Sequence, residues 1–153
     1  MEFEFIAPGD KPAMALLSTT DWLETSKAVL RELGYKVHAP PSHEEFSSRF
    51  TQIQYEVVLT EPLFAASNPS ENLSLLSLQR MPMMQRRHAV VILIGNEFET
   101  LNAMQAYQQS VHGVVHPRQL SSLGQIVRQV VSDTSLLMTV FRDTQARIAA
   151  GKL

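Results

Sequence analysis

Histidine, serine and acidic side chains are the residues of this chain that could perform catalysis or bind a metal ion. The five histidines stand at positions 38, 43, 88, 112 and 116, and none belongs to an H-E-x-x-H motif or to an H-x₃-H pair on a predicted helix. His38 and His43 flank a Pro-Pro turn, whereas His112 and His116 stand at opposite ends of a predicted strand. We therefore predict no metal site.

Other reactive patterns are missing from the sequence as well. It contains no G-x-S-x-G, G-x-G-x-x-G, P-loop or D-x-H-x-x-G pattern, and its six glycines offer little for a loop that cradles phosphate. The absence of cysteine excludes a thiol nucleophile, a disulfide framework and a thiolate metal site. We therefore expect neither catalysis nor a cofactor.

Composition sets the class of protein. The chain has 153 residues, 44% of them hydrophobic and 18% charged, which suits one globular domain. Its formal net charge of -2 gives no basic field, so we do not expect this chain alone to bind nucleic acid or anionic lipid. No apolar run approaches the ~18 residues of a membrane span, and the acidic start MEFEFIAPGDKP is unlike a signal peptide. The expected location is the cytoplasm.

Apolar runs alternate with segments of helical periodicity. We predict strands at 13–17, 36–39, 55–60, 89–94 and 113–116, and helices after each of them. Two capping boxes mark the starts of helices, Asp21 with Glu24 and Ser42 with Glu45. A third helix is predicted at 72–80, ended by Pro82, and a fourth is predicted to be capped by Asn96 and Glu99 and to end near Ser110.

Five strands interleaved with helices favour an α/β fold with a parallel sheet covered on both faces. Right-handed crossovers favour a flavodoxin-like strand order, 2-1-3-4-5. We predict one domain over residues 13–131. Residues 1–12 form an N-terminal extension, and residues 132–153 form an extended C-terminal helix that is either part of the domain or a dimerisation element.

This pattern resembles the receiver domain of bacterial response regulators over about residues 12–131. The resemblance rests on the order of elements, the Gly34-Tyr35 turn, the YEVVL strand and the hydrophobe-then-proline element at strand five. The segments FEFIAPGDKPA, RMPMMQRRHAVVILIG and SLLMTVFRDTQ also look like a divergent receiver-like region found behind zinc ribbons in some bacterial proteins. No cysteine occurs here, so a ribbon is not part of this sequence.

The resemblance implies a site at the carboxyl ends of the strands whose usual residues are replaced. Ser18 and Thr19 stand where the family has an acidic pair that helps to hold Mg²⁺, and Asp21 is the nearest carboxylate. Glu61, or Thr60 if the register slips by one, stands at the phosphoacceptor aspartate. The family's hydroxyl residue and lysine are replaced by Ile94, followed by Gly95, and by His116, followed by Pro117.

These replacements remove both the metal ligands and the cation that phosphoryl transfer to a carboxylate requires. We therefore predict a domain that works without phosphorylation. Glu61 either holds a permanent negative charge in place of a phosphoryl group or is a solvated residue at a strand end.

A basic cluster and the C-terminal helix are the remaining candidate interaction sites. The cluster contains Arg80, Arg86, Arg87 and His88 beside Met81, Met83 and Met84, and is either a docking site for an acidic partner or nucleic-acid backbone, or a solvated helix end. On the C-terminal helix, apolar residues and threonines alternate by four and three, as in a coiled coil. They are Leu123, Val127, Val130, Thr134, Leu137, Phe141, Thr144 and Ile148.

Two functions follow from these features. The first is a signalling or regulatory protein-interaction module with an unidentified partner, which homodimerises through the C-terminal helix. The competing interpretation of that helix is a break at Ser132-Asp133 and a last segment folded back on its own domain. The second function is a small-molecule sensor that binds its ligand in the crevice at the strand ends, lined by Ser18, Thr19, Asp21, Glu61, Gly95 and His116.

Overall fold

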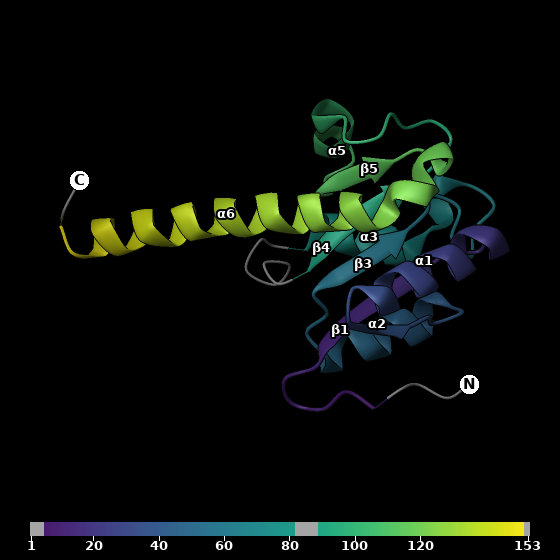
Figure 1. Ribbon diagram of the computed structural model, residues 1–153, viewed down its shortest axis with the longest axis horizontal. Coiled ribbons are helices and arrows are strands. Elements are labelled where there is room, and N and C mark those ends of the chain that lie inside the picture. The colour runs from purple at the N-terminus through teal and green to yellow at the C-terminus, as the bar shows by residue number, and fades with distance from the viewer. Residues whose placement is uncertain (1–4, 82–88, 152–153) are drawn as a thin grey trace.

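The computed structural model describes residues 5–81 and 89–151 and shows a parallel five-stranded sheet between two layers of helices (Figure 1). The strand order is β2-β1-β3-β4-β5, which confirms the predicted topology. Nearly every strand residue is buried, as expected for a sheet covered on both faces. The strands are β1 (Lys11–Leu16), β2 (Tyr35–His38), β3 (Val57–Thr60), β4 (Val90–Ile94) and β5 (Gly113–Val115).

The strand register brings the carboxyl ends of the strands together. Leu16 pairs with Thr60, and Thr60 pairs with Leu93 on its other side. On the next strand, Leu93 pairs with Val114. Residues that follow β1, β3, β4 and β5 therefore meet at one edge of the sheet, which is the usual ligand-binding edge of an open α/β fold.

Alternate strand residues point into two separate apolar cores. Ala13, Ala15 and Ile92 belong to the core under α1 (Thr20–Glu32) and α6 (Leu123–Ala149). Met14, Leu16 and Leu93 belong to the other core. That second core is covered by α2 (His43–Gln52), α3 (Leu73–Arg80) and α5 (Ala103–Gln108). The short 3₁₀ helices η1 (Pro69–Glu71) and η2 (Pro117–Ser122) lead into α3 and α6.

One predicted helix cap is confirmed and two are wrong. The Ser42 side chain accepts a hydrogen bond from the Glu45 amide at the start of α2. By contrast, Thr19 is the N-cap residue of α1 and Asp21 lies within its first turn. The helix after β4 begins only at Ala103 and is capped by Asn102, because residues 96–102 form turns that tie the Leu101 amide to the Val114 carbonyl at 2.9 Å. The predicted stop at Pro82 lies outside the described residues.

Helix α6 is continuous over 27 residues, so the predicted break at Ser132-Asp133 and the folded-back segment are wrong. Its first turns pack on the sheet through Leu123, Ile126, Val127 and Val130. The remainder projects beyond the domain (Figure 1). Neither serine nor aspartate removes a backbone donor, so neither interrupts a helix as proline would. Within residues 5–81 and 89–151, no helix is long and apolar enough to cross a membrane.

Candidate functional site

Glu61 is the central residue at the carboxyl edge of the sheet. It follows β3 directly and its side chain is buried, with only 4% of its surface exposed. One carboxylate oxygen, Oε1, accepts hydrogen bonds from the Ser18 amide and from the Thr19 amide at 2.7 Å. The other, Oε2, accepts from the Thr19 hydroxyl at 2.9 Å. The interpretation of Glu61 as a solvated residue is therefore wrong.

Thr60 has a different role from Glu61. It is the last residue of β3, and its hydroxyl donates to the Leu16 carbonyl at 3.1 Å. The hydroxyl thus ties β3 to the neighbouring strand β1, while the residue after it reaches the start of α1. Glu61 is the first residue after β3, and its side chain is the one that accepts hydrogen bonds from Ser18 and Thr19.

The loop after Glu61 is held to the same site. The Ser18 hydroxyl accepts from the Ala65 amide at 2.7 Å. The buried Asn72 side chain donates to the Glu61 carbonyl at 2.9 Å and to the Pro62 carbonyl at 3.1 Å, and it accepts from the Leu75 amide to cap α3. Asn72 was missed as a site residue, although its place before an apolar helix was a signal for a cap.

The other residues predicted at the strand-end site have different surroundings from Ser18, Thr19 and Glu61. Asp21 is exposed in the first turn of α1, where a negative charge suits the helix dipole. Ile94 is buried in the core under α1 and α6. Gly95 donates its amide to the Val115 carbonyl at 3.0 Å, and a Cβ atom there would lie 2.6 Å from Glu97 Oε1 and 2.9 Å from the Phe98 ring.

His116 caps the 3₁₀ helix η2. Its ring nitrogen Nδ1 accepts from the Arg118 amide at 3.0 Å, and its own amide donates to the Thr100 hydroxyl at 2.9 Å. Pro117 then occupies the first position of η2, where its missing amide costs nothing. The structure therefore brings together Ser18, Thr19 and Glu61, and it gives His116 a separate role as a helix cap.

The other histidines of the described chain bind neighbouring protein groups. His38 is buried and its Nδ1 lies 2.6 Å from the Tyr55 hydroxyl, and His43 Nδ1 lies 2.7 Å from the Ser74 hydroxyl. His112 Nδ1 accepts from the Val91 amide at 2.9 Å. In residues 5–81 and 89–151, no group of three or more histidine, cysteine or acidic residues is placed to hold a metal ion.

The predicted basic cluster lies mostly outside the described residues. This holds for Arg86, Arg87 and His88, and for Met83 and Met84 beside them. Arg80 is exposed in the last turn of α3, where a positive charge suits the helix dipole.

The predicted interaction surface of α6 divides into two parts. Leu123, Val127 and Val130 are buried against the sheet, so they belong to the core of the domain. Beyond Val131 the apolar residues are mostly exposed, with Leu137 at 65%, Phe141 at 48% and Ile148 at 57%. Leu136 and Val140 widen this surface and are 67% and 55% exposed.

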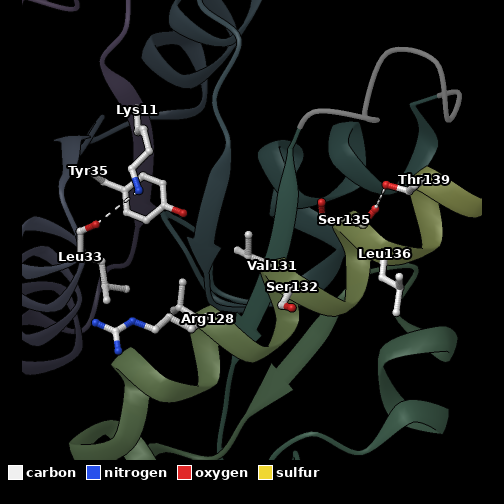
Figure 2. A pocket seen from close by; sticks show the side chains of 10 residues that line it. Lys11, Leu33, Tyr35, Arg128, Val131, Ser132, Ser135, Leu136 and Thr139 are labelled. Carbon is white, nitrogen blue, oxygen red and sulfur yellow. Dashed lines mark hydrogen bonds between the residues drawn. The ribbon is translucent and has the colours of Figure 1, made fainter.

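A cavity of about 570 Å³ lies where α6 leaves the sheet, at the amino ends of β1 and β2 (Figure 2). Lys11 and Tyr35 form one side of it, and the Lys11 ammonium lies 4.5 Å from the centre of the Tyr35 ring. Arg128, Ser132 and Leu136 of α6 form the other side. This cavity is at the opposite end of the strands from Glu61.

Neither protein-family models nor curated protein sequences give a match to this chain. Solved structures do match. A response regulator from Thermotoga maritima has a TM-score of 0.61 at 13% identity, and the match covers 80% of this chain and 98% of that chain. A CheY-like receiver domain protein from Methanospirillum hungatei has a TM-score of 0.61 at 13% identity, covering 83% and 98% of the two chains.

NtrX from Brucella abortus, solved with ADP, matches with a TM-score of 0.66 at 12% identity and covers 94% of this chain. This chain spans only 30% of the length of NtrX. At these identities the matches establish the fold. The chain has the flavodoxin-like fold seen in response-regulator receiver domains.

Proposed function

We propose that this receiver-like domain is a protein-interaction module that acts in signalling or regulation without phosphorylation and homodimerises through α6. The observation that carries the proposal is the hydrogen bonding of Glu61. Both of its carboxylate oxygens accept hydrogen bonds from Ser18 or Thr19 of the same chain.

Phosphoryl transfer to a carboxylate requires an exposed oxygen and cations that neutralise the developing charge. Glu61 is buried, and its donors are two backbone amides and a hydroxyl, all of them neutral. Ser18 and Thr19 supply no carboxylate for Mg²⁺, which prefers such ligands. Phosphorylation of Glu61 would break bonds that already join β3 to α1, with no metal to replace them.

Glu61 instead acts as a built-in anion at the strand-end site. Its negative charge lies at the start of α1, where the helix dipole favours an anion. A carboxylate fixed there keeps the β1–α1 and β3–α3 connections in one arrangement, since Ser18 also binds Ala65 of the second connection. The surfaces of the domain are then constant, as a constitutive docking module requires.

The exposed part of α6 supports homodimerisation. Most helical stability in proteins comes from packing of an apolar face. Beyond Val131, Leu137, Phe141 and Ile148 lie on one side of α6 and are exposed. A surface of this kind marks an interaction site.

The alternative function, a small-molecule sensor at the strand-end crevice, stays a prediction. A ligand there would have to compete with the bonds that Ser18, Thr19 and Glu61 already make to one another. A thermal-shift screen with metabolites distinguishes the two functions, because only a sensor is stabilised by a bound small molecule.

Sedimentation equilibrium tests the proposed homodimer. The whole chain should sediment as a dimer, and a chain that ends at Ser132 should sediment as a folded monomer. Changing Leu137 and Phe141 together to aspartate should also give a monomer, whereas Met104→Asp, an exposed apolar position on α5, should leave the dimer intact. A whole chain that is monomeric at all concentrations would overturn the homodimer.

A further inference from the structure

The exposed part of α6 has a heptad pattern that continues from its buried part. Spacings of four and three place Thr134, Phe141 and Ile148 at heptad position a, and Leu137 and Thr144 at position d. The same stripe begins with Leu123, Val127 and Val130, which are buried in the domain. The stripe therefore runs without interruption from the core of the domain to the free end of the helix, so the uncovered part lacks only a partner surface.

The residues that flank this stripe indicate whether a partner helix would run parallel or antiparallel to α6. Asp133, Val140 and Arg147 follow one another at intervals of seven residues and occupy position g, and Met138 and Gln145 occupy position e. Charges at positions e and g set the orientation of coiled coils. Asp133 and Arg147 are both exposed and opposite in charge, and Asp133 accepts one long hydrogen bond of 3.4 Å from Gln129 on the same helix.

The residues at position g face different residues of the second helix in a parallel pair and in an antiparallel pair. In a parallel pair position g faces position e of the other helix, so Asp133 would face Met138 and Val140 would face Gln145, without an ion pair. In an antiparallel pair position g faces position g. Asp133 then faces Arg147 of the second copy, Arg147 faces Asp133 of the second copy, and Val140 faces Val140 on the two-fold axis.

The antiparallel register also matches the core positions. Leu137 then packs opposite Phe141 of the second copy, and Thr134 packs opposite Thr144. We infer that α6 binds α6 of a second copy of this chain in this antiparallel register, with Val140 at the two-fold axis. This inference rests on the proposed homodimer and adds the direction and register of the two helices.

The projecting part of α6 is long enough for this arrangement. Helix α6 projects from the domain along its own axis (Figure 1), and residues 132–149 of a helix span roughly 27 Å. An antiparallel pair therefore places the two domains at opposite ends of the paired segment. Ile148 of each copy then lies at the level of Val130 and Val131 of the other, where the helix enters its domain.

Exchange of the charges tests the orientation. Asp133→Arg places two arginines against each other at both ends of the antiparallel pair, and Arg147→Asp places two aspartates there. Each variant alone should dimerise at least about tenfold more weakly than the unchanged chain at low salt. A mixture of the two variants should form a heterodimer as tight as the original dimer, because every g–g contact is again Asp against Arg. A dimer affinity that neither single variant changes would overturn the inference.

Cross-linking gives an independent result, because the chain has no cysteine of its own. A single Val140→Cys should form an intermolecular disulfide rapidly, and a single Thr144→Cys should do so slowly. A parallel pair reverses this order, since it places Thr144 against Thr144. A dimer by sedimentation that cross-links through position 144 would overturn the antiparallel register and leave the proposed homodimer standing, whereas a monomer would overturn both.

Discussion

The carboxylate of Glu61 lies 2.7 Å from the backbone nitrogen of Thr19 and 2.9 Å from the Thr19 hydroxyl oxygen. Thr19 is the N-cap residue of α1, and its own side chain makes no capping hydrogen bond to the helix. Glu61, the residue after β3, thus accepts hydrogen bonds from the polar groups of the N-cap residue of α1. This contact joins a strand and a helix that are 42 residues apart in the sequence.

Replacement of Glu61 should destabilise the domain. Glu61→Ala removes the acceptor of three part-buried hydrogen bonds, from two amides and a hydroxyl, and we expect a loss of about 2–4 kcal/mol in the free energy of unfolding. Glu61→Gln keeps one acceptor oxygen and should lose about half as much. Urea denaturation followed by the fluorescence of Trp22 measures both changes.

The control for this experiment is Glu56→Gln. Glu56 is exposed and precedes β3, so its replacement should change the free energy of unfolding by less than about 0.5 kcal/mol. If Glu61→Ala is as harmless as this control, the carboxylate does not hold β3 to α1.

The proposal that the domain works without phosphorylation predicts a negative titration. Beryllofluoride with Mg²⁺ mimics a phosphoryl group on a carboxylate, and both oxygens of Glu61 already accept hydrogen bonds from Ser18 or Thr19. Trp22, the only tryptophan, is half-buried at the start of α1 and reports on this region. We expect no saturable change in its fluorescence. A saturable change that also requires Mg²⁺ would contradict the proposal.

Two glycines near the base of α6 should respond in opposite ways to alanine. At Gly113 of β5 a Cβ atom would lie 2.9 Å from Val130 Cγ2, so Gly113→Ala should push α6 from the sheet and cost about 1–3 kcal/mol. At Gly124 of α6 a Cβ atom would meet only Val29 Cγ1 at 3.7 Å, so Gly124→Ala should stabilise the helix by about 0.5–1 kcal/mol. Thermal unfolding distinguishes the two variants.

A second substitution tests whether contact with Val130 causes the loss of stability in Gly113→Ala. Val130→Ala removes the methyl groups that an added Cβ atom would meet. The cost of Gly113→Ala should therefore be smaller in the Val130→Ala background than in the original chain. Equal costs in the two backgrounds would show that the contact between β5 and α6 is not the reason.

The sequence predicted the fold because its signals are local. Apolar runs such as residues 89–94 gave the strands, and the Ser42 box gave the start of α2. The bonds of Glu61 could not be predicted in this way, because they depend on the register of β1 against β3. The late start of α5 was missed for a similar reason, since the Leu101 amide is held by the Val114 carbonyl of a later strand.

The same limit applied to α6. Apolar residues spaced by four and three occur both in helices that pack on a sheet and in coiled coils. Periodicity alone therefore could not show which of the apolar residues of α6 are buried against the sheet and which are exposed. In the folded protein Val130 is buried against the sheet, whereas Leu137 is 65% exposed. The hydrogen bond between His38 and Tyr55, two positions separated by 17 residues, likewise required the tertiary structure.

The buried pair of His38 and Tyr55 predicts a loss of stability at high pH. Burial raises the pKa of Tyr55 from its ordinary value of 10.0 to about 12. A proton held more tightly in the folded state contributes stability that is complete below pH 10 and is lost as the pH rises towards 12. The free energy of unfolding should therefore fall by roughly 1–3 kcal/mol over this range.

Tyr55→Phe should cost about 1–2 kcal/mol at neutral pH, because it removes a buried hydroxyl 2.6 Å from His38, and should flatten this loss. Absorbance of ionised tyrosine provides the measurement, since one of the three tyrosines should titrate near pH 12 in the original chain and be absent from the variant. A stability profile that stays equally steep in Tyr55→Phe would assign the loss to another group, and burial also raises the pKa of Tyr35.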